Sequence, residues 1–134
     1  MNVLGLHHVG IISPTIEHAR IFLDTLGLEE DYCEYVEEYQ SDCLFVKHGP
    51  NDSPIELIIP RGGVLAEYNN GKGGLHHIAL TVDNVEEFTA HWKEKGQNLL
   101  EEIPVVGAGG IRVNFLRPRY TGGVLVEFVE NPKE

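Results

Sequence analysis

Basic residues are scarce in this sequence of 134 residues. Lysine and arginine together number 10, against 21 aspartates and glutamates, and the net charge is −11 at pH 7. A surface with this charge repels phosphate backbones and anionic lipid, so nucleic acid is excluded as an expected partner. An anionic small molecule could still bind where a metal ion or a local basic group, such as Arg112, Arg117 and Arg119, offsets the background.

Long apolar runs are also absent. No stretch approaches the roughly 18 apolar residues that span a bilayer, and the first residues lack a basic start followed by an apolar core. We therefore expect no membrane segment and a cytoplasmic protein.

Cysteine occurs only at Cys33 and Cys43, without a CxxC spacing. A disulfide framework and a cysteine-rich metal site are therefore not expected, and both residues are interpreted as reduced thiols. Hydrophobic residues make up 42% of the chain and the mean hydropathy is −0.15. These values favour a globular protein, and the length predicts a single domain over residues 1–134.

The sequence contains one motif twice. Residues 6–11 (LHHVGI) match residues 75–80 (LHHIAL) in type at every position, at an offset of 69 that carries His8 to His77. An apolar pattern with helical spacing follows each copy, and a glycine ends each pattern, at Gly27 and Gly96. We expect Ser13 or Thr15 to cap the first helix, and Asp83 with Glu86 to form a capping box for the second.

Short β-rich segments follow each predicted helix, separated by glycine-rich or polar turns. They are residues 32–39, 43–47 and 55–59 in the first copy, and residues 98–102, 112–116 and 124–129 in the second. Each copy thus has a βαβββ pattern, with module 1 at about 1–62 and module 2 at about 73–134. The predicted fold class is α+β, with the two modules forming one curved mixed sheet that has its helices outside.

Four residues occupy equivalent positions in the two copies. His8 and His77 lie in the opening strands, and Glu56 and Glu127 lie in the closing strands. A carboxylate flanked by apolar residues is costly to bury unless a cation compensates its charge. Two imidazoles and two carboxylates suit one divalent ion of zinc, nickel, cobalt, iron or manganese, with positions left open for substrate.

The alternative is that these four are edge-strand side chains exposed to solvent, which their repetition makes less favoured. The strand period of two directs the adjacent His7 and His76 to the opposite side, so they are second choices as ligands.

The paired His-His strands, the paired apolar-Glu-apolar strands and the two modules resemble the vicinal oxygen chelate superfamily over essentially the whole chain. That group contains glyoxalase I, methylmalonyl-CoA epimerases, fosfomycin-resistance proteins, extradiol dioxygenases and metal-free bleomycin-binding proteins. The epimerase branch is most similar, through three runs of the second module: residues 74–79 (GLHHIA), residues 102–104 (EIP) with 109–118 (GGIRVNFLRP), and residues 123–127 (GVLVE). The resemblance implies a glyoxalase-like fold and supports His8, Glu56, His77 and Glu127 as metal ligands.

The chain departs from the epimerase pattern at two positions. Epimerases of the family usually have glutamine where this chain has Glu56, and they use a third-strand glutamate as one of two bases where this chain has Cys43. Glyoxalase I differs in another way, because this chain has no arginine near His8 for the glutathione carboxylate.

The expected function is that of a metal-dependent epimerase or isomerase that removes a proton next to a carbonyl, with an acyl-CoA thioester as a candidate substrate. Glu127 and Glu56 are the expected catalytic bases, one on each side of the reacting carbon. A glyoxalase I-type lactoylglutathione lyase is the first alternative, and a non-catalytic small-molecule binding module is the second. A dioxygenase is disfavoured because Glu56 would fill the face that a 2-His-1-carboxylate iron site leaves free. The resemblance also implies a homodimer.

Overall fold

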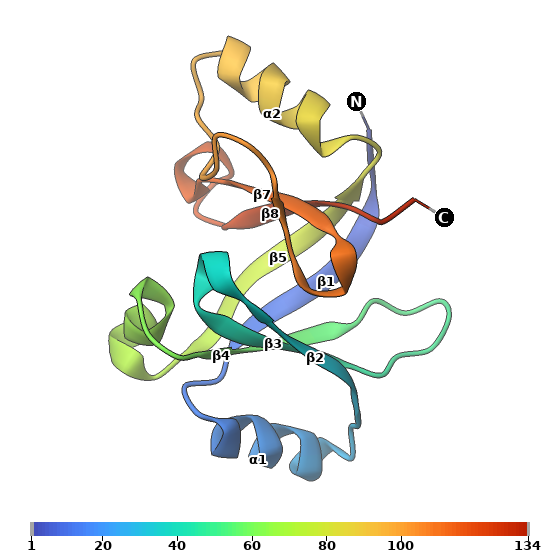
Figure 1. Ribbon diagram of the computed structural model, residues 1–134, viewed down its shortest axis with the longest axis vertical. Helices are drawn as coiled ribbons and strands as arrows, with labels where there is room; N and C mark the ends of the chain where they lie inside the picture. Colours follow the sequence, from blue (N-terminus) through green and yellow to red (C-terminus); the bar gives the residue numbers. More distant parts are fainter. Residues whose placement is uncertain (1, 134) are drawn as a thin grey trace. The chain divides into compact units, whose positions relative to one another are not determined.

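The computed structural model describes residues 2–133 of the chain (Figure 1). Its helices and strands follow one another in the order β1 (Val3–Ile12), α1 (Ile16–Leu26), β2 (Glu30–Val36), η1 (Glu37–Tyr39), β3 (Ser41–Val46), β4 (Ile55–Pro60), η2 (Val64–Gly71), β5 (Gly74–Val82), α2 (Val85–Glu94), β6 (Val105–Val106), η3 (Ala108–Gly110), β7 (Arg112–Leu116), η4 (Pro118–Tyr120) and β8 (Val126–Glu130). The strands are hydrogen-bonded in the order β2-β3-β4-β1-β5-β8-β7-β6. The predicted α+β class and the mixed sheet are confirmed.

The chain divides into two compact units, which we call the N-terminal unit (residues 8–76) and the C-terminal unit (residues 2–7 with 77–133). These bounds differ from the predicted modules, because the first residues of β1 belong with the second copy and the linker belongs with the first.

In the N-terminal unit, β2, β3 and β4 form an antiparallel meander, and β4 pairs in parallel with β1. Helix α1 covers one face of these strands, where its buried Ala19 contacts a cluster on β3 and β4 made of Leu44, Val46, Leu57 and Ile59. Because side chains alternate along a strand, Cys43, Phe45, Glu56 and Ile58 lie on the opposite face. This second face carries the candidate site.

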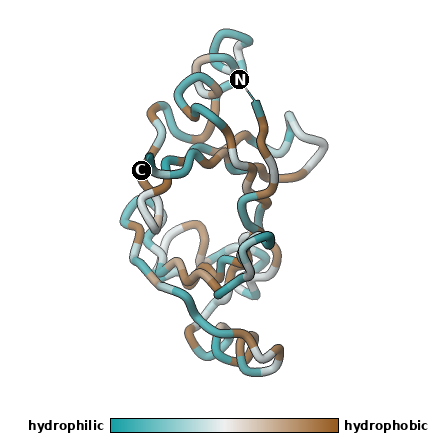
Figure 2. The backbone as a smooth tube through the Cα atoms, turned by 90° about the vertical axis from the view of Figure 1, so that its right-hand side faces the viewer, coloured by the Kyte–Doolittle hydropathy of each residue, from teal (hydrophilic) through white to brown (hydrophobic). Residues whose placement is uncertain are grey.

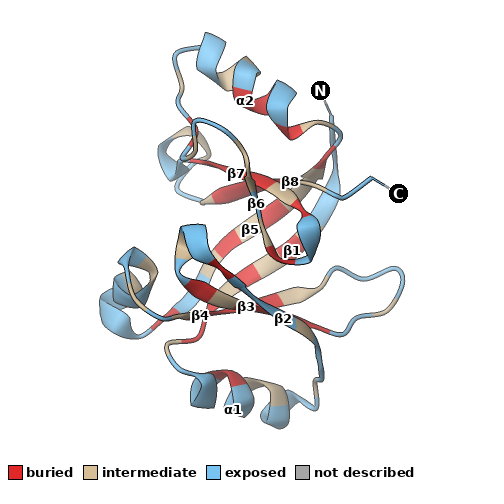
Figure 3. Ribbon diagram, in the orientation of Figure 1, coloured by how far each residue is buried: buried red, intermediate tan, exposed pale blue. Residues whose placement is uncertain are grey.

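The C-terminal unit repeats the pattern, with β8 parallel to β5 and antiparallel to β7. The residues buried against α2 are Val82, Val85, Phe88, Leu99, Leu116, Val126 and Phe128. Figure 3 shows that both helices expose most of their surface and bury a narrow stripe. Figure 2 shows hydrophobic and hydrophilic stretches of the backbone interleaved along the chain.

The helix ends match the sequence predictions in part. The Thr15 hydroxyl caps α1 by accepting a hydrogen bond from the His18 N–H, and Gly27 ends the helix in the left-handed conformation. The predicted capping box of α2 is wrong, because the Asn84 side chain caps that helix and accepts from the Glu87 N–H. The Asp83 carboxylate instead accepts from the backbone N–H of Asn2.

One predicted strand is also wrong. Residues 98–102 form no strand, and the short edge strand of the second copy is β6, at Val105–Val106. The reason is Asn114 on β7, whose buried amide accepts from the Glu101 N–H at 2.9 Å and donates to the Glu101 carbonyl at 2.8 Å. A side chain thus satisfies the backbone groups that a strand ladder would otherwise pair.

No helix among residues 2–133 is long and apolar enough to cross a membrane.

Candidate metal and proton-transfer site

His8 and Glu56 form the first half of the candidate site, in the N-terminal unit. Both side chains are buried, with His8 0% and Glu56 8% exposed. They meet because β1 and β4 run in parallel with Gly10 next to Glu56, which places His8 on the same face of the pair of strands. The His8 Nε2 and Glu56 Oε1 atoms are 3.2 Å apart.

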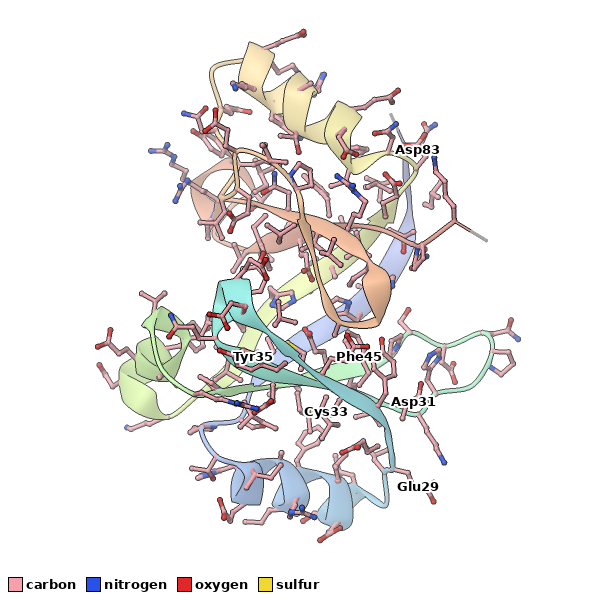
Figure 4. All side chains as sticks on the ribbon, viewed as in Figure 1. Glu29, Asp31, Cys33, Tyr35, Phe45 and Asp83 are labelled. Carbon is pink, nitrogen blue, oxygen red and sulfur yellow. The ribbon has the colours of Figure 1, made fainter. Side chains whose placement is uncertain are left out.

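Phe45 on β3 (labelled in Figure 4) completes this half-site from the side. It is the direct cross-strand neighbour of Glu56, and its ring meets the His8 imidazole edge to face at a centroid distance of 5.3 Å. Tyr32 on β2 stacks on the other side of Phe45 at 5.1 Å. These rings fix the imidazole and exclude water from it.

The C-terminal unit contains the same arrangement. His77 on β5 and Glu127 on β8 are buried, and their Nε2 and Oε1 atoms are 3.1 Å apart. Phe115 on β7 is the cross-strand neighbour of Glu127, and its ring lies edge to face against His77 at 5.4 Å. The duplication thus repeats a histidine, a glutamate and a phenylalanine in one geometry.

Both carboxylates are buried on strands whose neighbours are largely apolar, where an ionised group needs a compensating charge. His8, Glu56, His77 and Glu127 are a buried group of imidazole and carboxylate donors that could hold a metal ion. The donor chemistry fits the divalent ions expected from the sequence.

Cys43 lies on the same face as Glu56, two residues before Phe45 on β3, and is buried. Its direct cross-strand neighbour on β2 is Glu34, which brings a carboxylate to the face that carries the half-site. Burial first, and then the nearby charges of Glu34, Asp31 and Glu56, raise the pKa of the Tyr32 phenol. Tyr32 is therefore protonated at neutral pH and available as a hydrogen-bond donor.

Asp42, the acidic residue next to Cys43 on β3, points away from this face. The alternation of β3 puts it on the opposite side, where Arg61 donates to its two carboxylate oxygens at 2.9 and 2.7 Å. Arg61 holds the pKa of Asp42 below its usual range. Two further acidic residues between β2 and β3, Glu37 and Glu38, are exposed in η1.

The neighbouring histidines take other partners, in agreement with their ranking as second choices. The His7 Nε2 atom is 3.0 Å from the side-chain oxygen of Asn131, and the His76 ring packs edge to face on Tyr68 at 4.9 Å.

Sequence reasoning identified the histidines and glutamates but missed Phe45, Phe115, Tyr32 and Glu34. The two phenylalanines carried a usable signal, since they stand 70 positions apart in the sequence, close to the repeat offset. Tyr32 and Glu34 have no such signal, because only the pairing of β2 with β3 brings them to the site.

Comparison with known proteins points to one superfamily. The model of the Glyoxalase/Bleomycin resistance protein/Dioxygenase superfamily matches residues 7–115. The mitochondrial methylmalonyl-CoA epimerase of Bos taurus is 36% identical over 133 residues, which cover 94% of this chain and 74% of that protein.

Two solved structures extend the likeness to three dimensions. The methylmalonyl-CoA epimerase of Mycobacterium tuberculosis is 26% identical, with a TM-score of 0.86 over 98% of this chain and 90% of that one. A variant of the Streptomyces coelicolor methylmalonyl-CoA epimerase, in complex with 2-nitronate-propionyl-CoA, is 27% identical, with a TM-score of 0.85 over 98% of this chain and 100% of that one.

Proposed function

The chain belongs to the glyoxalase/bleomycin resistance protein/dioxygenase superfamily, and we propose that it is a metal-dependent epimerase acting on an acyl-CoA thioester such as methylmalonyl-CoA. The observation that carries the proposal is the repeated half-site, a buried histidine and glutamate locked by a phenylalanine, in a chain similar to methylmalonyl-CoA epimerases along nearly its whole length.

His8, Glu56, His77 and Glu127 would hold one divalent ion of zinc, nickel, cobalt, iron or manganese. That the two half-sites share this ion is part of the proposal. It is supported by donor number, because each pair supplies two protein ligands and a catalytic site in a protein usually supplies three or four. When bound, the ion acts as a Lewis acid towards the substrate's carbonyl oxygen, where negative charge develops during proton removal.

The chain's own residues then handle the proton. Glu127 and Glu56 are the proposed bases, and their places in the two copies suit approach from opposite sides of the reacting carbon, as inversion requires. Phe45 and Phe115 hold the two imidazoles in place and keep water from the carboxylates.

The glyoxalase I-type lyase is a weaker candidate. Two carboxylates in the donor set resemble some glyoxalase I sites, but the curated relatives with names of known activity are epimerases. A non-catalytic binding module is also disfavoured, because all four donors are present and buried.

The oligomeric state and the cellular location are predictions. A homodimer is supported by the exposed apolar side chains of Val3, Leu4 and Leu6 on β1, which an interface would bury. A cytoplasmic location is expected from the sequence, although several relatives are mitochondrial enzymes.

The test combines metal analysis of the purified protein with two substrates. If the protein is an epimerase, we expect a bound divalent metal and interconversion of the two epimers of methylmalonyl-CoA. We expect little turnover of the hemithioacetal of methylglyoxal and glutathione. Preference for the hemithioacetal would support the lyase instead. Binding of thioesters without turnover of either substrate would support the binding module.

A further inference from the structure

Arg117 and Arg119 differ from Arg61 and Arg112, which each form an ion pair with an acidic residue. Arg112 pairs with Glu86, for example, whereas neither Arg117 nor Arg119 has a carboxylate within ion-pair distance in residues 2–133. Two such cations only two positions apart are notable in a chain of net charge −11. They create a local field that attracts an anion against the background of the whole molecule.

Arg117 and Arg119 line the same surface hollow. It has a volume of about 460 Å³ and is lined by Asn98, Arg117, Pro118 and Arg119. A single anion in this hollow can therefore meet both arginines and the amide of Asn98. Guanidinium groups bind phosphate oxygens through paired N–H donors, which makes arginine well suited to phosphate recognition.

The turn that carries the two arginines is fixed before any ligand arrives. The Pro118 carbonyl accepts from the backbone N–H of Thr121 at 3.0 Å and of Gly123 at 2.8 Å. The Arg119 guanidinium lies over the Tyr120 ring at 4.9 Å, and Tyr120 packs against the core beneath α2. Such preorganisation lowers the entropic cost of binding.

The hollow adjoins the C-terminal half-site along one strand. Arg117 follows β7 with extended backbone angles, two residues after Phe115, which neighbours Glu127. Because side chains alternate, Arg117 leaves the strand on the side of Phe115, at about 7 Å along the chain. A substrate whose reacting end lies at Glu127 can extend its remaining length toward the arginines.

We propose that Arg117, Arg119 and Asn98 form a subsite for the phosphate groups of the coenzyme A part of the substrate. This inference rests on the proposed function for the identity of the ligand. Coenzyme A carries a diphosphate and a ribose phosphate far from its thioester, so the subsite sets affinity and substrate class without touching the reacting carbon.

The experiment measures binding of free coenzyme A by calorimetry to the wild type, to Arg117→Ala/Arg119→Ala, and to a matched control, Arg20→Ala/Lys72→Ala. The control removes the same charge from the exposed surface of the N-terminal unit. We expect affinity to fall about tenfold or more in the first variant and to change little in the control. Arg117→Lys/Arg119→Lys keeps the charge and should recover part of the affinity, which provides a second variant if the alanine pair fails to fold.

Kinetics give the second readout. For methylmalonyl-CoA the alanine pair should raise KM and leave kcat nearly unchanged, while for the pantetheine thioester, which lacks the nucleotide phosphates, both constants should match the wild type. Wild-type binding of coenzyme A by the alanine pair, or an equal loss on both thioesters, would overturn the subsite. Arginine-dependent binding in a wild type that epimerises neither thioester would instead refute the proposed function and keep the subsite.

Discussion

Each half-site contributes one histidine to the proposed metal site, His8 from one and His77 from the other. His8→Ala and His77→Ala should each abolish stoichiometric metal binding, because an open site then loses one of its two imidazoles. Metal content after gel filtration measures this. His7→Ala and His76→Ala are matched controls, since these neighbours point to the other side of their strands. Wild-type metal content in both site variants would refute the shared metal site.

Glu56 is the residue where the chain departs from the usual glutamine of the epimerases. If Glu56 is the second base, Glu56→Gln should bind metal and lose epimerisation by about two orders of magnitude, the usual scale of general-base catalysis. Near-normal activity would place the second base elsewhere on the same face. Cys43 and Glu34 are then the candidates, because the register of β2, β3 and β4 puts both beside the half-site.

At the scale of elements, Asn114 ties residues 98–102 to β7. Its amide also donates to the Thr89 hydroxyl at 3.1 Å, which joins α2 to the same network. Asn114→Ala leaves the part-buried N–H and C=O of Glu101 without their partners and should lower the free energy of unfolding by about 2 kcal/mol. Urea unfolding measures the loss. Asn51→Ala, in an exposed turn, is the control, and an equal effect there would contradict the role of the network.

The ion pair between Asp42 and Arg61 links β3 to the end of β4, and its contribution to stability depends on pH. Because folding lowers the pKa of Asp42, the stabilisation is present above the ordinary pKa of aspartate and is lost as pH falls through the lowered value. Asp42→Asn should therefore lower the free energy of unfolding by about 1 kcal/mol or less at pH 7. The difference in this free energy between variant and wild type should become smaller below about pH 4. Thermal unfolding across pH, with Asp24→Asn as control, tests this; a difference that stays constant to low pH would contradict it.

The elements that the sequence predicted are those with local signals. Spacing of apolar residues located both helices, and Thr15 and Gly27 marked the ends of α1 because capping depends on neighbouring residues alone. The strand predicted at residues 98–102 failed for the opposite reason, and the cap of α2 was placed one residue early, because Asp83 bonds to Asn2 and Asn84 caps the helix. Asn114 acts across 13 positions and Asn2 across 81, and no local pattern announces such partners.

In the molecule as a whole, the duplication explains why the sequence points to His8 with Glu56 and to His77 with Glu127 as equivalent pairs. Two copies of a histidine and a glutamate in matching strands limit where their side chains can point, so the pairs at 3.2 and 3.1 Å follow from the repeat. The identity of the metal does not follow from the repeat, and neither does the proposed role of Arg117 and Arg119, which have no counterpart in it.

The assembly of the protein is a prediction at this scale. Exposed Val3, Leu4 and Leu6 on β1 should be buried in a homodimer at micromolar concentration. Sedimentation velocity measures the state, and Leu4→Lys should shift the protein toward monomer. A monomeric wild type at this concentration would contradict the prediction.

Proton transfer by Glu127 is tested by the rate of solvent deuterium incorporation at the reacting carbon of methylmalonyl-CoA, compared between wild type and Glu127→Gln at matched metal content. The amide oxygen of glutamine can still bind metal, but it cannot accept the proton. The account predicts that Glu127→Gln keeps much of the metal and loses exchange by about two orders of magnitude or more. Exchange at the wild-type rate in this variant would contradict the claim that Glu127 moves the proton.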